Sequence, residues 1–179
     1  GGNLWPERPL ADLRRRERLG QGAELSMRIA FDCDEAGLPL KPVILEHLLE
    51  LGIDVVDLNL LGQRPVDYPD IAHHLARRVA AGEFERGLLV CGTGLGMAMM
   101  ANKVAGVFAG PCHDVYSAER LCKSNAAQVL TLGARVIGPE LAKTIIAAWV
   151  HSRFERGRSL PKVERMRELE RQEFGRAPA

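Results

Sequence analysis

The chain has 179 residues, of which 46% are hydrophobic and 26% charged, and its formal net charge is +1. These values are typical of one globular domain with a substantial core. The near-neutral charge gives no reason to expect nucleic acid or a membrane surface as a partner. No apolar run approaches the roughly 20 residues that a membrane-spanning helix needs.

Residues 1–26 differ from the rest of the chain, because they are rich in Arg, Gly and Pro and the globular pattern begins only at Met27. Met27 is therefore a candidate natural start, and residues 1–26 are either sequence added for expression or a loosely ordered extension. The arginine run in "RRRER" is expected to be a solvated arm. The segment lacks the apolar core of a secretory signal, so we expect a cytoplasmic protein with reduced thiols.

From Met27 onward, strand and helix patterns alternate up to the end of the chain. Short apolar, partly β-branched runs predict strands at residues 28–33, 53–60, 87–92, 106–112 and 127–133. Helical spacing, with Pro near the starts and Gly near the ends, predicts helices at 39–52, 68–82, 115–125 and 139–154. This alternation implies an α/β fold, a doubly wound, Rossmann-like parallel sheet of five strands with helices on both faces. The domain spans residues 27–179. Its last helix, 161–174, has too little apolar surface to be core, so we expect it to pack on a partner subunit.

Ligands of such sheets bind beyond the carboxyl ends of the strands. The stretch "CGTGLG", residues 91–96, follows a predicted strand there. Its glycines leave backbone N–H groups unobstructed at the start of a helix, where anions bind. The spacing matches neither the dinucleotide fingerprint nor the P-loop. Taken alone, the loop fits a purely structural tight turn equally well.

Cys91, directly before these glycines, adds a chemical group to the loop. A thiol beside a helix N-terminus has a lowered pKa. The thiolate could attack a carbonyl, or it could remove a proton from the carbon next to one. Attack would call for an adjacent histidine base, which the local sequence lacks, whereas proton abstraction needs only the base and donors for the enediolate oxygens. The four cysteines show no C-x-x-C spacing, so no metal site is expected.

Several motifs, in this order, carry a family resemblance: "CGTGLGM", "ANKVAGV", "DVYSAER", "SNAAQVLTLGARVIG" and "FERGR". From about Met27 to Lys162 the chain resembles the ribose-5-phosphate isomerase B and galactose-6-phosphate isomerase family. The resemblance implies an enzyme that interconverts aldose and ketose phosphates without a metal or organic cofactor. It also implies homodimers, often tetramers, with active sites between subunits. The expected ligand is a small phosphorylated sugar.

The resemblance implies a role for each matching residue. Cys91 takes the proton between carbons 1 and 2, Asp34 contacts substrate hydroxyls, and Asn125 binds the reacting end. The enediolate is lined by Gly92, Thr93, Gly94, Leu95 and Gly96. The phosphate ligands are Arg135, Arg158 and Lys162. His113 and Tyr68 are further candidates at the rim of the site.

Two positions depart from the family pattern. Glu35 stands where the family has a histidine that helps to hold the phosphate, so either Glu35 turns away to pair with an arginine or the far end of the substrate differs. Ser124 stands where the family has the histidine assigned to opening the sugar ring and to shuttling the hydroxyl proton, and a serine cannot replace an imidazole as an acid. A four-carbon sugar phosphorylated on carbon 4 has no hydroxyl with which to close a furanose, so it needs no ring opener.

The "SNAAQ" and "GRS" variants also resemble the branch that acts on D-erythrulose 4-phosphate and D-erythrose 4-phosphate, which makes this pair the favoured substrate and product. The alternatives are a ribose 5-phosphate isomerase, a partner-dependent subunit of a galactose-6-phosphate-type enzyme, and a nucleotide-binding module. Activity of the purified chain alone, and thermal shifts with nucleotides against sugar phosphates, would separate them.

Overall fold

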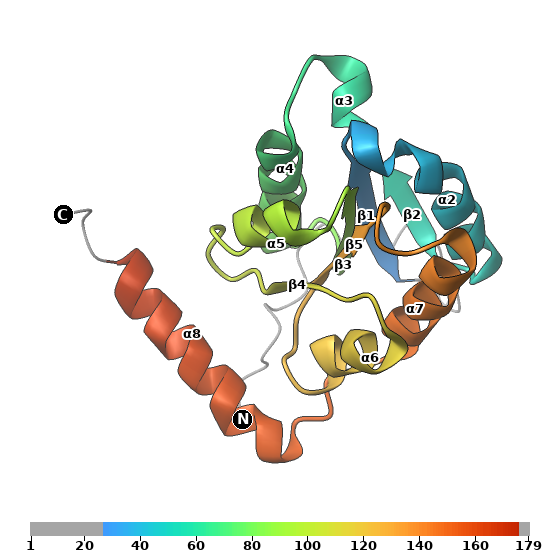
Figure 1. Cartoon of the computed structure of the whole chain (residues 1–179). Helices are drawn as coiled ribbons and strands as arrows, with labels where there is room; N and C mark the ends of the chain where they lie inside the picture. Colours follow the sequence, from blue (N-terminus) through green and yellow to red (C-terminus); the bar gives the residue numbers. More distant parts are fainter. Residues whose placement is uncertain (1–26, 176–179) are drawn as a thin grey trace, which may run out of the picture.

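The computed structural model describes residues 27–175, and the predicted extension at residues 1–26 lies outside this range. The described chain forms a parallel five-stranded sheet with the strand order β2-β1-β3-β5-β4 (Figure 1). The strands are β1 (Arg28–Cys33), β2 (Asp54–Asp57), β3 (Arg86–Cys91), β4 (Ala109–Pro111) and β5 (Val129–Gly133). The predicted fold class is confirmed.

Helices cover both faces of the sheet, and each face has its own apolar core. The α-helices are α2 (Lys41–Glu50), α3 (Leu60–Gln63), α4 (Tyr68–Ala80), α5 (Leu95–Ala101), α6 (Val115–Lys123), α7 (Pro139–His151) and α8 (Leu160–Phe174), and the 3-10 helices are η1 (Glu35–Leu40) and η2 (Gly157–Ser159). Residues of α2, α6 and α7 form the core of one face, and residues of α4 and α5 form the core of the other. No helix in the described range is long and apolar enough to cross a membrane.

Strand β3 shows why its last side chain points toward α5. Side chains of a strand alternate between the two faces of a sheet. Leu88 and Val90 belong to the core under α2, α6 and α7, whereas Leu89 and Cys91 belong to the core under α4 and α5. The Cys91 sulfur therefore lies on the face where the next helix begins.

Two predicted strands are too long, and side-chain chemistry explains both errors. The strand predicted at 53–60 ends at Asp57, because Asn59 adopts a left-handed conformation with a φ of 46° and Leu60 starts α3. The strand predicted at 106–112 is reduced to β4. The preceding residues form a loop clamped by the Gln128 amide, which accepts from Phe108 N at 2.9 Å and donates to Gly106 O at 2.8 Å.

Helix α8 extends away from the sheet as an arm (Figure 1). Among its described residues only Val163 is buried. Glu170 accepts a hydrogen bond from Gly106 N at 3.0 Å, and the Arg167 guanidinium lies 5.9 Å from the centre of the Phe108 ring. These contacts fix the direction of the arm against the loop before β4. That α8 packs on a partner subunit stays a prediction.

Candidate active site

Strand β3 ends at Cys91, and the chain then turns through the glycine loop into α5. The Cys91 side chain is 6% exposed, and its Sγ accepts a hydrogen bond from Gly94 N at 3.1 Å. Gly94 adopts a φ of 78°, a left-handed conformation that glycine takes at little cost. A backbone donor aimed at sulfur stabilises the negatively charged form of that sulfur, so this loop suits a thiolate.

The remaining cysteines have different surroundings. Burial raises the pKa of the Cys33 and Cys112 thiols to about 12, and it also raises the pKa of Cys122. The sulfurs of Cys112 and Cys122 lie 3.8 to 4.0 Å from backbone carbonyls, which accept only from a protonated thiol. Among the described residues, Cys91 is the cysteine whose sulfur accepts a backbone N–H. The four thiols therefore differ in the polar groups that they face.

The loop after Cys91 presents Thr93 to solvent and packs against Tyr68. The exposed Thr93 hydroxyl accepts a hydrogen bond from Leu95 N at 3.3 Å. A Cβ added at Gly96 would lie 2.5 Å from Cε2 of Tyr68, so the tyrosine ring rests directly on the first turn of α5. Tyr68 starts α4, which places it beside the glycine loop from the neighbouring connection.

Asp34 and Arg135 flank the loop from the ends of β1 and β5. Asp34 Oδ1 caps η1 by accepting from Gly37 N at 3.1 Å, and burial raises the pKa of its carboxyl while the Arg135 charge opposes that rise. Arg135 N donates to Gly92 O at 3.0 Å, and a Cβ added at Gly92 would lie 3.5 Å from Arg135 Cδ. An acceptor for hydroxyls and a cation for an anionic group thus stand beside Cys91.

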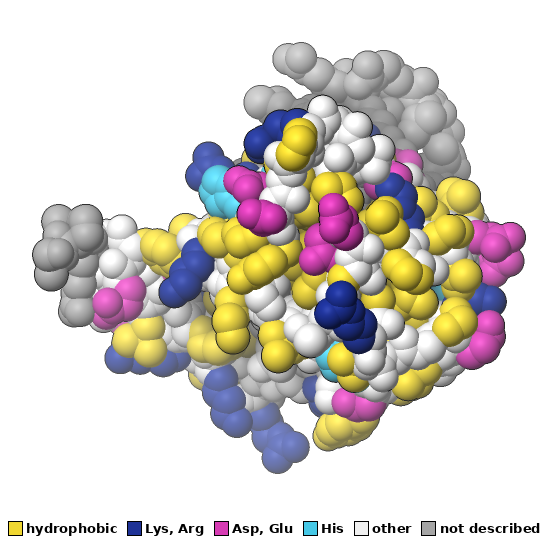
Figure 2. Space-filling model, turned by 45° about the horizontal axis from the view of Figure 1, so that its top comes forward, with side chains coloured by type: hydrophobic (Ala, Val, Ile, Leu, Met, Phe, Trp, Pro, Cys, Tyr) yellow, Lys and Arg dark blue, Asp and Glu magenta, His cyan; other side chains and the backbone are white. Residues whose placement is uncertain are grey.

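Glu35 lies next to Asp34 in the first turn of η1 and is exposed. No cation within the part of the chain that the structure describes pairs with it, so the proposed pairing with an arginine is not found there. Figure 2 brings this edge of the sheet forward and shows acidic and basic side chains close together on a largely apolar surface.

His113 accepts a hydrogen bond from the last residue of β5. Its Nε2 accepts a hydrogen bond from Gly133 N at 2.9 Å, so the ring is neutral with its proton on Nδ1. Burial lowers the pKa of His113, which keeps the ring neutral. A Cβ added at Gly133 would lie 2.8 Å from Thr93 Cα, which shows how close this turn comes to the loop.

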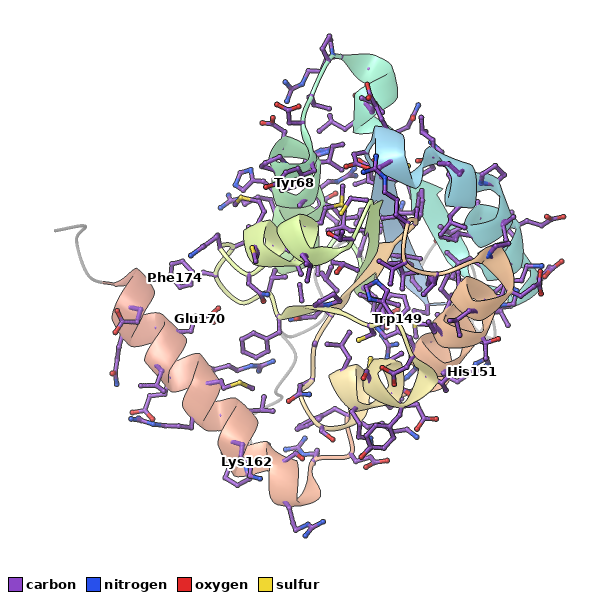
Figure 3. All side chains as sticks on the ribbon, viewed as in Figure 1. Tyr68, Trp149, His151, Lys162, Glu170 and Phe174 are labelled. Carbon is purple, nitrogen blue, oxygen red and sulfur yellow. The ribbon has the colours of Figure 1, made fainter. Side chains whose placement is uncertain are left out.

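The predicted residues Ser124, Asn125, Arg158 and Lys162 lie elsewhere. Helices α6 and α7 start at the carboxyl edge of the sheet and run back, so residues after their ends lie at its amino edge. Asn125 Nδ2 donates to Arg120 O at 3.1 Å, and Ser124 Oγ accepts from Arg120 at 3.3 Å. Figure 3 shows Lys162 at the far end of the molecule from Tyr68. A single chain does not bring these residues to Cys91.

Sequence reasoning missed two buried polar residues at the carboxyl edge. Asp32 is 1% exposed, and its carboxylate accepts from Cys33 N at 2.9 Å and from Leu60 N at 3.3 Å. Thr131 is fully buried and donates to Gly94 O at 2.7 Å. The sequence did hold a sign of both residues, because each is a polar side chain within a mostly apolar strand. Burying such a side chain without a partner is costly. Among the described residues, no group of three His, Cys, Asp or Glu side chains could hold a metal ion.

Comparison with known proteins identifies similar chains over most of this length. The family model described as Ribose/Galactose Isomerase matches residues 29–166. D-erythrulose-4-phosphate isomerase of Pectobacterium atrosepticum is 50% identical to this chain, and the match covers 82% of this chain and 97% of that protein. Ribose-5-phosphate isomerase B of Escherichia coli is 43% identical, and the match covers 80% of this chain and 96% of that protein. The solved structure of Clostridium thermocellum ribose-5-phosphate isomerase B superimposes with a TM-score of 0.77 at 38% identity, covering 82% of this chain and 99% of that one.

Proposed function

The chain belongs to the ribose/galactose isomerase family of sugar-phosphate isomerases, and we propose that it interconverts D-erythrulose 4-phosphate and D-erythrose 4-phosphate with Cys91 as the base. The observation that carries the proposal is the hydrogen bond from Gly94 N to the Cys91 sulfur, with Asp34 and Arg135 beside it. It supports a thiolate base next to groups that can hold hydroxyls and an anion.

The reaction needs one base and a set of donors. The Cys91 thiolate removes the proton from the carbon next to the carbonyl, and the electron pair of that C–H bond forms the enediolate. The negative charge develops on the carbonyl oxygen, where the loop amides and Thr93 stabilise it. The thiol then returns the proton to the neighbouring carbon, and the proton of the substrate hydroxyl passes to the former carbonyl oxygen. Together these two transfers exchange aldehyde and ketone without any change in redox balance.

The four-carbon substrate is supported by Ser124. The resemblance assigns ring opening to an imidazole at position 124, and this chain carries a hydroxyl there. A tetrose 4-phosphate is open-chain, so its isomerisation needs no ring-opening step. The relatives from Pectobacterium atrosepticum and Mycolicibacterium smegmatis that bear the name D-erythrulose-4-phosphate isomerase are 50% and 42% identical to this chain.

We further propose that two copies of the chain complete each site. Asn125 follows α6 at the amino edge of the sheet, and the two cations, Arg158 in η2 and Lys162 in the first turn of α8, stand where the arm begins. In a homodimer, alone or within a tetramer, the arm of one chain delivers these cations to the substrate phosphate held near Cys91 of the other.

An isomerisation assay with C4, C5 and C6 sugar phosphates tests the function. The tetrose phosphate is expected to turn over fastest, and Cys91→Ala is expected to lower kcat by about 10²–10⁴-fold. Cys112→Ala is the matched control, since it removes an equally buried thiol that faces a carbonyl. A clear preference for ribose 5-phosphate would contradict the substrate, and an active Cys91→Ala would contradict the base.

Mixing two inactive variants tests the shared site. Cys91→Ala and Asn125→Ala lose different halves of the proposed site, so a mixed dimer retains one complete site. Random exchange of subunits should restore about a quarter of the wild-type activity. If both halves of each site came from one chain, mixing would restore nothing.

A further inference from the structure

We infer that Thr131, a buried residue of β5, is a positioning residue that orients the glycine loop toward Cys91 and the substrate. This inference deepens the proposed function and rests on the role proposed there for Cys91. Thr131 is the polar residue of an otherwise apolar strand, it is fully buried, and its hydroxyl donates to Gly94 O at 2.7 Å.

The hydrogen bond acts on one defined peptide unit. A trans peptide is planar, so its C=O and N–H point in opposite directions. The Gly94 carbonyl is held inward by Thr131, and the N–H of the same peptide, that of Leu95, therefore points outward. There it meets the exposed Thr93 hydroxyl at 3.3 Å. The Gly94 carbonyl also accepts from Ala98 N at 3.1 Å, so Thr131 and the first turn of α5 together hold this amide toward the side where substrate oxygens would bind.

The same residue also limits how Gly94 can move. Gly94 has a φ of 78°, and a Cβ added there would lie 3.1 Å from both Thr131 Oγ1 and the Leu132 carbonyl carbon. Gly94 is therefore held closely against β5. Its own N–H, on the opposite side of the residue, donates to the Cys91 sulfur at 3.1 Å. Thr131 therefore bonds to and packs against the residue that supplies the donor to the sulfur.

Two substitutions separate the hydroxyl from the volume of the side chain. Thr131→Val keeps the shape but cannot donate, and Thr131→Ser keeps the donor with a smaller side chain. We expect Thr131→Val to lower kcat by about tenfold with KM changed less than about twofold, because the loss of one neutral hydrogen bond is of that order. Thr131→Ser is expected to retain most of the wild-type kcat. Thr131→Ala, which also lacks the donor, replaces the valine variant if that variant does not fold.

Alkylation of Cys91 gives a readout that a merely structural role would not change. The rate of carboxamidomethylation by iodoacetamide is followed against pH by mass spectrometry of the peptide that contains Cys91, with Cys91→Ala as the blank. The pH of half-maximal rate is expected to be higher in Thr131→Val than in the wild type, because the Gly94 donor is less firmly directed at sulfur. Thr131→Ser should restore the wild-type profile.

The outcomes distinguish this inference from the proposed function. Wild-type kcat and an unchanged alkylation profile in Thr131→Val would overturn the positioning role. The positioning role would also be overturned if Thr131→Val and Thr131→Ser lost equal amounts of kcat in proportion to their lowered melting temperatures. Such losses would come from packing and not from the hydroxyl. An active Cys91→Ala would overturn the role of Cys91 in the reaction, while the alkylation profile would still report whether Thr131 orients the loop.

Discussion

The stability of the chain is expected to depend on pH through Asp32, which lies at the end of β1. Burial raises the pKa of this carboxyl from its ordinary value of 3.8 to about 6, although it accepts hydrogen bonds from Cys33 N and Leu60 N. The neighbouring Asp57 charge adds to the rise and Lys41 opposes it. The folded chain therefore holds the Asp32 proton more tightly than the unfolded chain does.

The sign follows from this difference. The Asp32 contribution to stability is complete below pH 3.8 and is lost as the pH rises through about 6. Because one pKa unit corresponds to 1.36 kcal/mol, ionised Asp32 costs the folded state about 2 to 3 kcal/mol between pH ~4 and pH ~7. Other carboxyl groups also change charge in acid, so the total change of stability with pH does not isolate the contribution of Asp32.

The variant Asp32→Asn isolates the contribution of Asp32 to the pH dependence of stability, because asparagine does not titrate. Urea unfolding of both proteins at the same concentration, from pH ~4 to pH ~7, gives the difference in free energy of unfolding between wild type and variant. That difference is expected to fall by about 2 to 3 kcal/mol across this range. A constant difference would show that burial does not control Asp32, and a rising difference would show that its partners outweigh burial.

Three further sets of variants test the glycine loop, the edge of the sheet and the Arg135 cation. Gly94→Ala and Gly106→Ala both place alanine at a positive φ, which costs about 1 kcal/mol of stability each. Only at Gly94 would the new Cβ contact neighbouring atoms, so only Gly94→Ala should also lose most of its kcat. Asn102→Ala should lower the free energy of unfolding by about 1–3 kcal/mol in thermal or urea melts, because its amide pairs with both Ala109 N and Ala109 O at 2.8 Å on the open edge of β4. Arg135→Ala should raise KM for the sugar phosphate about tenfold with the fold intact, and Arg135→Lys should recover only part of the loss.

The fold could be predicted because each strand is a short apolar run and each connection contains helical spacing. The alternation alone leads to a parallel sheet with two covered faces, which the structure confirms. The errors at 53–60 and 106–112 have a common origin. Apolar residues there are buried by turns and loops, and the hydrogen bonds that form those turns come from Asn59 and Gln128 in ways that no periodicity reveals.

The candidate site could be predicted only in part. The strand ends bring Asp34, Cys91 and Arg135 together as expected from the topology. Thr131 was missed because its importance depends on which peptide its hydroxyl meets across the sheet. The separation of Asn125 from Cys91 was also hidden from the sequence, because it depends on where α6 ends relative to the sheet edges.

Cys91 and Cys33 are the last residues of two neighbouring strands, and their sulfurs have different polar neighbours. Cys33 is 3% exposed and Cys91 is 6% exposed, so both sulfurs are almost equally withdrawn from water. Cys33 lies beside the buried carboxyl of Asp32, whereas Cys91 receives the N–H of Gly94. The glycine loop therefore supplies the backbone contact that sets Cys91 apart from Cys33, and the strand only determines where the thiol stands. A change that turned the Gly94 N–H away would leave Cys91 as deeply buried as before and without the backbone donor on which its proposed role as a base rests.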